Sequence, residues 1–98
     1  MNQSMSFEAF ERYLKNNQQI KSVESYLNYL QQSIKYLGVA TNRFFSATLF
    51  EARCWEAKLK NNTAFQGLSY EYRSNIVTGY HAYLDCLRDQ AGLSNTNN

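Results

Sequence analysis

The sequence predicts an all-α domain built from four helices in two helical hairpins. The composition supports this, because none of the 98 residues is proline and only four are glycine, whereas turn-rich β folds use both. The apolar residues also recur three or four positions apart, which is the spacing of one face of an α-helix. We therefore expect long amphipathic helices that pack their apolar faces into one core.

Length and charge restrict the possible functions. A hydrophobic content of 44% suffices for one modest core, and the net charge of +2 is far from that of a histone-like protein. Binding to nucleic acid would therefore depend on where the charges lie. The sequence has no secretory signal and no apolar run of membrane-spanning length, so we expect a cytoplasmic protein that engages no membrane.

The cysteines give no sign of a metal site or a cofactor. Cys54 and Cys86 stand alone, without a CxxC pair and without histidines at ligand spacing. A reduced setting without zinc is the expected state. We therefore predict no metal, no cofactor and no small-molecule substrate.

The clearest helix signal is the segment 22–37. Ser22 can cap the first turn, and Gly38 can end the helix in a left-handed conformation. The apolar residues of this segment are Val23, Leu27, Leu30, Ile34 and Leu37. The residues of the opposite side are Lys21, Ser25, Asn28, Gln32 and Lys35. One helix thus offers an apolar face to the core and a nearly acid-free polar face to water or to a partner.

Three further helices are expected. Two of them, at about 6–16 and 69–90, begin at a serine that can cap the helix. The remaining one is predicted at about 46–60, between loops at 39–43 and 61–68.

The helical domain is expected to extend over residues 6–91. Residues 1–5 are predicted to be a flexible N-terminus, and residues 92–98 a flexible tail or the start of a linker. Gly79 lies inside the last predicted helix, where it costs about 1 kcal/mol relative to alanine. We interpret this glycine as a point at which another helix approaches closely.

One internal similarity supports the arrangement in two hairpins. Segments 10–17 and 55–62 both end a predicted helix with a Leu-Lys pair and two asparagines, and both start with an aromatic residue. Each precedes a helix capped by serine. A duplication and a chance similarity are both compatible with this pattern.

Two of the predicted helices resemble those of a known DNA-binding domain. The core-binding domain of tyrosine recombinases and phage integrases has a second helix similar to segment 21–30, which reads Lys-Ser-Val-Glu-Ser-Tyr-Leu-Asn-Tyr-Leu and is followed by Leu37-Gly38. A later, serine-capped helix of that domain is similar to segment 68–87. The residues that carry this second similarity are Leu68, Ser69, Ile76, Tyr80, Tyr83, Leu84 and Leu87. The resemblance spans about 7–87 and implies a SAM-like orthogonal bundle of two crossed hairpins.

The resemblance also implies a function. Segment 55–87 is similar to helical N-terminal domains of some bacterial restriction endonucleases as well, so both relatives are DNA-binding modules beside a separate catalytic domain. The chain holds one histidine and none of the recombinase motifs, and we expect no catalysis from it. The implied function is the DNA-binding accessory domain of a recombinase, an integrase or a restriction-type nuclease. The implied partners are duplex DNA and either a C-terminal catalytic domain or a second copy of this chain.

The expected DNA contacts lie on the polar face of segment 22–37 and near the start of the last helix. Lysines neutralise phosphates, while serine and asparagine hydrogen-bond to phosphates or base edges. Tyr29 and Tyr36 flank the polar face and could rest on sugars or bases. The predicted contact residues are Lys21, Ser22, Ser25, Asn28, Lys35, Arg73 and Ser74. A solvated helix face without a partner would show the same pattern.

A second candidate surface is the outer side of the last helix. Its residues are Tyr70, Ser74, Thr78, His81 and Arg88. Free backbone N–H groups at the helix N-terminus favour phosphate there, and Arg73 adds positive charge. Glu71, Asp85 and Asp89 dilute that charge further along. His81 is expected to be a surface residue that pairs at most with Asp85, four positions on.

A smaller apolar stripe marks the helix predicted at 46–60. Its residues are Ala47, Phe50, Cys54 and Ala57. We expect them to be buried against the segment 39–45, and the alternative is a contact surface for another chain. That alternative corresponds to a different function, a small protein-interaction module or a phage or bacterial regulator without catalysis.

Overall fold

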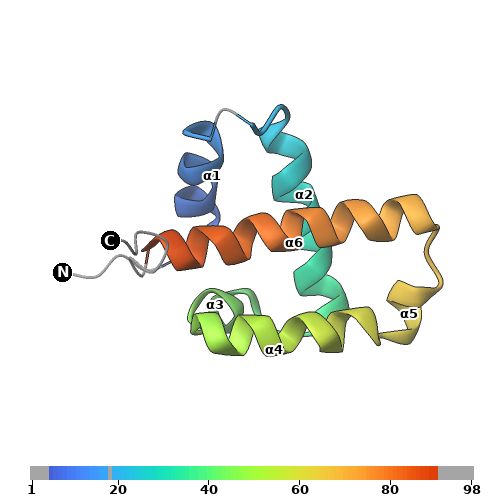
Figure 1. Cartoon of the computed structure of the whole chain (residues 1–98). Helices are drawn as coiled ribbons and strands as arrows, with labels where there is room; N and C mark the ends of the chain where they lie inside the picture. Colours follow the sequence, from blue (N-terminus) through green and yellow to red (C-terminus); the bar gives the residue numbers. More distant parts are fainter. Residues whose placement is uncertain (1–4, 18, 91–98) are drawn as a thin grey trace.

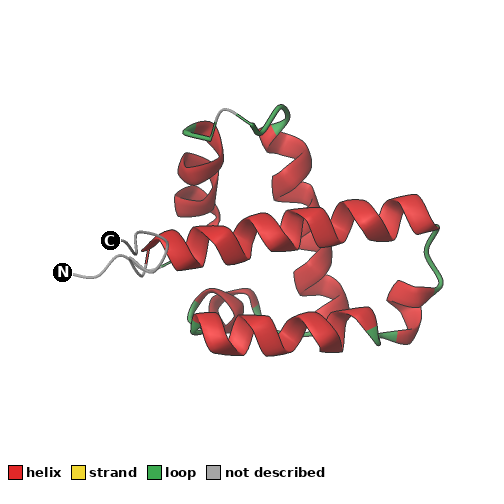
Figure 2. Ribbon diagram, in the orientation of Figure 1, coloured by secondary structure: helices red, strands yellow, loops and turns green. Residues whose placement is uncertain are grey.

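The computed structural model describes residues 5–17 and 19–90, and all regular structure in these ranges is helical (Figures 1 and 2). The helices are α1 (Phe7–Lys15), α2 (Val23–Leu37), α3 (Thr41–Phe45), α4 (Leu49–Lys60), α5 (Thr63–Gln66) and α6 (Tyr70–Gln90). The predicted all-α class is thus confirmed. Four of the helices correspond to the four predicted ones, and α3 and α5 lie in segments predicted as loops.

Serine side chains start three of the long helices, as the sequence predicts. Ser6 Oγ accepts a hydrogen bond from the backbone N–H of Ala9 at 3.1 Å, and Ser69 Oγ accepts one from Tyr72 at 3.1 Å. Ser22 caps α2 in the same way. Gly38 ends α2 with a φ of 75°, in the left-handed region that favours glycine.

α4 begins three residues later than predicted, because another residue pair caps it. Thr48 Oγ1 accepts the backbone N–H of Glu51 at 3.1 Å, and Glu51 Oε1 accepts the backbone N–H of Thr48 at 3.2 Å. This reciprocal capping box satisfies two backbone donors at once and fixes the start of the helix.

The two short helices owe their structure to buried aromatic residues. α3 has no side-chain cap, but it buries Phe44 and Phe45 completely or almost completely. α5 is capped by Asn62 and buries Phe65. Helices of four or five residues do not persist alone in water, so tertiary contacts hold both in place.

α6 is the longest helix, and the others are arranged around it (Figure 1). α2 crosses behind it, α1 stands beside α2, and α4 runs along the other side of α6. At the crossing, a Cβ atom on Gly79 would lie 2.5 Å from Tyr29 Cβ and 3.5 Å from the Leu30 backbone nitrogen. The close approach inferred from Gly79 is therefore confirmed, while the SAM-like arrangement of hairpins stays a prediction.

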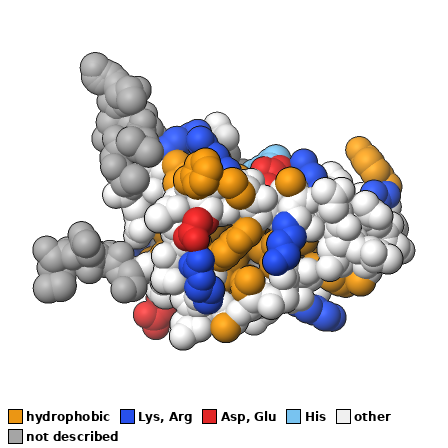
Figure 3. Space-filling model, turned by 90° about the horizontal axis from the view of Figure 1, so that it is seen from below, with side chains coloured by type: hydrophobic (Ala, Val, Ile, Leu, Met, Phe, Trp, Pro, Cys, Tyr) orange, Lys and Arg blue, Asp and Glu red, His pale blue; other side chains and the backbone are white. Residues whose placement is uncertain are grey.

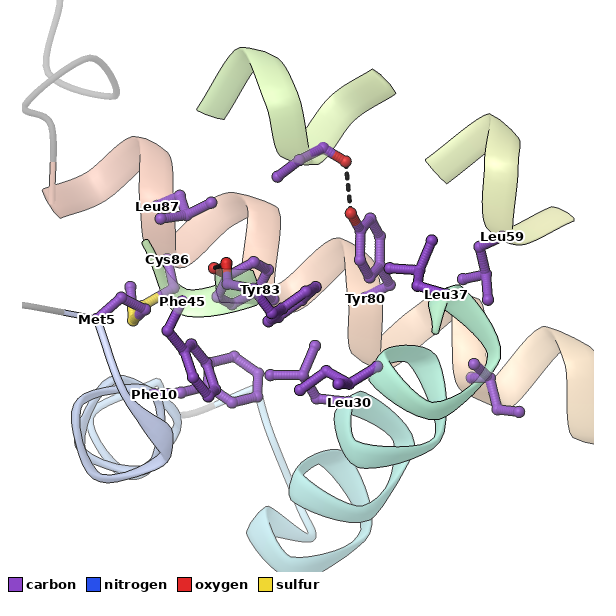
Figure 4. Close-up of a cluster of buried hydrophobic side chains, with 14 of the residues drawn as sticks. Met5, Phe10, Leu30, Leu37, Phe45, Leu59, Tyr80, Tyr83, Cys86 and Leu87 are labelled. Carbon is purple, nitrogen blue, oxygen red and sulfur yellow. Dashed lines mark hydrogen bonds between the residues drawn. The ribbon is translucent and has the colours of Figure 1, made fainter. Parts of the chain in front are cut away.

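Two tyrosines of α6 connect it to α4 and α3 inside the core (Figure 4). The Tyr80 hydroxyl donates to the carbonyl of Ala52 at 2.5 Å, and the Tyr83 hydroxyl donates to the carbonyl of Phe44 at 3.3 Å. Both side chains are fully buried. Each buried hydroxyl therefore has a partner, which avoids the cost of an unsatisfied polar group.

The N-terminal boundary differs from the predicted one. Met5, assigned by the sequence to a flexible N-terminus, is only 6% exposed and packs in the core. The rest of the predicted flexible ends, at 1–4 and 92–98, lies outside the described residues.

The buried tyrosines predict a loss of stability in alkali. Burial raises the pKa of Tyr80 and of Tyr83 above the ordinary value of 10.0, and raises the pKa of Cys86 to about 12. In the unfolded chain these groups ionise near their ordinary values, while in the folded protein they stay neutral. Their contribution is thus complete below pH 9 and is lost as the pH rises, by about 1.4 kcal/mol per pH unit for each group.

Urea unfolding followed by circular dichroism between pH 8 and pH 10.5 measures this slope. We expect the midpoint to change little up to about pH 9 and to fall with increasing steepness above it. Tyr80→Phe removes one of the ionising groups, so the fall in this variant should be shallower. A midpoint that is flat to pH 10.5 would show that the hydroxyls are accessible to water.

Candidate nucleic-acid interface

The polar face of α2 is open along its length. Lys21, Asn28 and Lys35 are all exposed, and none is covered by another described segment. Asn28 and Lys35 are seven residues apart within α2, close to two helical turns, so their side chains follow one line along the helix about 10 Å apart. Lys21 precedes the N-cap Ser22 and lies beside the start of the helix. These three residues are called the α2 polar face below.

Ser22 and Ser25 hydrogen-bond to each other at the start of α2. The Ser22 hydroxyl donates to Ser25 Oγ at 2.8 Å, and Ser22 Oγ accepts the Ser25 backbone N–H at 3.3 Å. These contacts cap the helix, and Ser25 is half-buried. Both predicted DNA contacts thus have a structural role that is visible in the fold.

The electrostatic potential at the α2 polar face is only moderately positive. Glu24 is exposed one turn before Asn28 and offsets one of the two lysines. Lys35 Nζ lies 5.5 Å from the ring centroid of Tyr36, which gives a weak cation–π contact. The Tyr36 ring also packs against the ring of Phe65, so part of this tyrosine side chain is in contact with the core.

Arg73 and Ser74 do not join the α2 polar face. At Gly79, α6 contacts α2 at Tyr26, Tyr29 and Leu30, whose side chains leave the helix about 100–200° around its axis from that of Asn28. Ser74 lies about 140° around α6 from Gly79, and therefore faces away from α2. The predicted contact set is divided between two opposite sides of the molecule. Linear spacing could not reveal this, because it does not give the helix crossing.

The outer side of α6 gathers its predicted residues in a shallow groove. The residues that line this groove are Lys60, Phe65, Tyr70, Arg73, Ser74, Val77, Thr78 and His81. Arg73 is half-buried, and its Nε donates to the carbonyl of Leu68 at 3.1 Å. Arg88 is at the other end of α6, where it pairs with Asp85 at 2.9 Å. Four of the five predicted residues are thus brought together, and Arg88 is not.

Glu56 neutralises part of this groove. Its carboxylate lies 2.6 Å from His81 Nε2 and 3.0 Å from Lys60 Nζ. Burial opposes ionisation of Glu56, but the hydrogen bonds from His81 and Lys60 outweigh it and lower the pKa of the carboxyl. His81 is an exposed surface residue, as predicted, but its ring pairs with Glu56, a carboxylate 25 residues away in the chain, whereas Asp85, the partner that the spacing allows, pairs with Arg88.

The predicted burial of the apolar stripe on α4 is also wrong. Phe50 is 76% exposed, and Cys54 and Ala57 are exposed as well, while Ala47 is buried. The segment expected to cover them forms α3, which packs Phe44 on Trp55, with ring centroids 5.9 Å apart. α3 therefore covers a different side of α4 and leaves the stripe uncovered.

Comparison of the chain with protein-family models, with curated proteins and with solved structures finds no match. Within the described ranges, no three His, Cys, Asp or Glu side chains gather where a metal ion could bind. None of the helices described is both long and apolar enough to cross a membrane. The resemblance to recombinase domains therefore stays a prediction from the sequence.

Proposed function

We propose that this domain binds duplex DNA through the α2 polar face. The observation that carries the proposal is the exposure of Lys21, Asn28 and Lys35, at the start of α2 and along its polar side. An α-helix with its side chains is about 10–12 Å wide, and the major groove of B-DNA is about 12 Å wide. Lys21 before the first turn of α2 and Lys35 in its last turn can reach phosphates at either end of such a site, while Asn28 between them can reach a base edge.

The resemblance supports a role as the accessory domain of a recombinase or a nuclease. In that role another domain supplies the catalysis, and this one holds the DNA. The chain's own residues fit this division, since the His81 ring is bound to Glu56 and no nucleophile with a neighbouring base is found in the described part of the chain. The modest charge of the face favours weak binding with little sequence preference.

Binding of a labelled 20-base-pair duplex, followed by fluorescence anisotropy, tests the proposal. With two or three phosphates neutralised, affinity should fall about 10- to 50-fold between 50 mM and 200 mM salt. The double variant Lys21→Glu/Lys35→Glu should bind at least about tenfold more weakly at 50 mM salt, because two attractive contacts become repulsive.

Lys58→Glu serves as the matched control. Combined with Arg53→Glu, it makes the same change of charge as the double variant, at exposed positions on α4 away from α2, and should leave the affinity within about twofold. Absence of binding at 50 mM salt would overturn the proposal. An equal loss in the control would show that only the net charge matters and that the α2 polar face is no binding site.

A further inference from the structure

The outer side of α4 carries an apolar stripe with positive charges on it. Its residues, called the α4 stripe, are Phe50, Arg53, Cys54, Ala57 and Lys58, and all are exposed. They recur three or four positions apart and span about 12 Å of helix. Phe50 and Tyr70 are the two large hydrophobic side chains that stand exposed in the described ranges. Ala52 and Leu59, on the opposite side of α4, anchor the helix in the core.

The carboxylates of α4 are already paired elsewhere. Glu51 Oε2 lies 2.6 Å from Arg43 Nη2, and Glu56 holds Lys60 and His81. Arg53 and Lys58 have no ion pair with any described residue. Figure 3, which views the molecule from the side of α4, shows apolar side chains between Lys and Arg side chains. The stripe is thus apolar along its middle and positive at its margins.

We propose that the α4 stripe docks an acidic amphipathic helix of another protein. The apolar face of that helix would pack on Phe50, with Cys54 and Ala57 allowing close approach because their side chains are small. Carboxylates beside that apolar face would pair with Arg53 and Lys58. This binding is independent of the DNA binding proposed for the α2 polar face.

A hollow between α4 and α6 enlarges the surface. Arg53 borders both the stripe and this hollow. The hollow is also lined by Leu84 and by two ion pairs, His81 with Glu56 and Arg88 with Asp85, so Arg53 is the cation there that is left for the partner. Leu84 is half-buried, so it offers apolar surface to a second side chain of the partner. The partner helix can therefore lie beside α4 and over the edge of α6.

Charge disfavours binding of the α4 stripe to a second copy of this chain or to one of its own terminal segments. A second copy packed stripe against stripe would bring Arg53 and Lys58 close to their own equivalents, and like charges across an interface are unfavourable. Segments 1–4 and 91–98 of this chain contain no aspartate and no glutamate. An acidic partner is the occupant that complements both cations.

Two designed helical peptides of 18 residues test the proposal. Both carry leucines at positions i, i+3, i+4 and i+7, and they differ only in having glutamates or lysines beside the leucines. Binding is measured by the anisotropy of a dye on the peptide at 0.15 M salt. The small surface predicts a dissociation constant on the order of 10–100 μM for the glutamate peptide, and binding at least about tenfold weaker for the lysine peptide.

Three protein variants assign the binding to the α4 stripe. Phe50→Asp should weaken binding of the glutamate peptide at least about tenfold, and it should fold normally because acids suit the first turn of a helix. The double variant Arg53→Glu/Lys58→Glu should no longer bind the glutamate peptide and should bind the lysine peptide instead. An unfolded variant would not show this reversal of preference. Lys35→Glu, the matched control on α2, should bind the glutamate peptide like the parent chain.

Four outcomes would overturn the proposal. The first is equal binding of the two peptides, and the second is a Phe50→Asp variant that binds like the parent. The third is a dimer that sedimentation detects and Phe50→Asp dissolves, which would assign the stripe to a second copy. The fourth is binding to phosphatidylserine vesicles without binding to the glutamate peptide, which would assign it to a membrane surface.

Discussion

Replacement of Phe44 by alanine is expected to destabilise the protein by about 3–5 kcal/mol, the range typical of a fully buried phenylalanine. Phe44 has no exposed surface, and its ring stacks on Tyr83 with centroids 4.7 Å apart and on Trp55 with centroids 5.9 Å apart. The substitution would open a cavity where α3, α4 and α6 meet. A loss of this size is a large part of the stability of a domain of 98 residues, which is on the order of 5–15 kcal/mol.

Phe50→Ala is the matched control, because it removes the same side chain from a site that is 76% exposed. Its free energy of unfolding should change by no more than about 0.5 kcal/mol. Urea unfolding monitored by Trp55 fluorescence and by circular dichroism gives both values. If the two variants lost similar amounts of stability, Phe44 would not be the centre of the core.

Gly79→Ala should also destabilise the protein, although alanine is normally the better helix former. The new Cβ would lie 2.5 Å from Tyr29 Cβ, which belongs to the rigid part of a side chain on α2. The helices must then separate, at a cost of about 1–3 kcal/mol for overpacking, against a gain of about 1 kcal/mol in helix propensity. We expect a net loss of up to about 2 kcal/mol, and a larger one for Gly79→Val, whose branched side chain needs more room.

Gly67→Ala provides the comparison for this variant. A Cβ at Gly67 would meet its nearest neighbour, the Ala64 carbonyl, at an ordinary 3.5 Å, and its backbone already has a negative φ. Its stability should therefore stay within about 0.5 kcal/mol of the parent. Stabilisation by Gly79→Ala of about 1 kcal/mol, as at a free helix position, would contradict the close crossing of α2 and α6.

Local signals in the sequence were sufficient for the long helices. Ser6, Ser22 and Ser69 predict helix starts because capping needs only a side chain and the next turn of backbone. Gly38 predicts a helix end for the same local reason. Gly79 also predicts a contact between helices, because a glycine inside a long helix indicates close approach by another helix. It does not indicate which helix approaches.

Contacts between distant segments could not be predicted in this way. α3 lies in a predicted loop, because its helix depends on the burial of Phe44 rather than on a cap. His81 pairs with Glu56, a residue distant in sequence, owing to the packing of α4 beside α6. The exposure of Phe50 and the separation of Ser74 from the α2 polar face follow from the same packing. Each depends on how the helices cross, which no local pattern specifies.

The hydrogen bond from Tyr83 to Phe44 has a consequence for the order of folding. The two residues are 39 positions apart, and α3 is far too short to form without partners from α6. The interior is therefore completed by α6, which comes after the other five described helices. During translation, we expect the earlier helices to stay loosely associated until α6 has left the ribosomal exit tunnel, so that native packing begins only then.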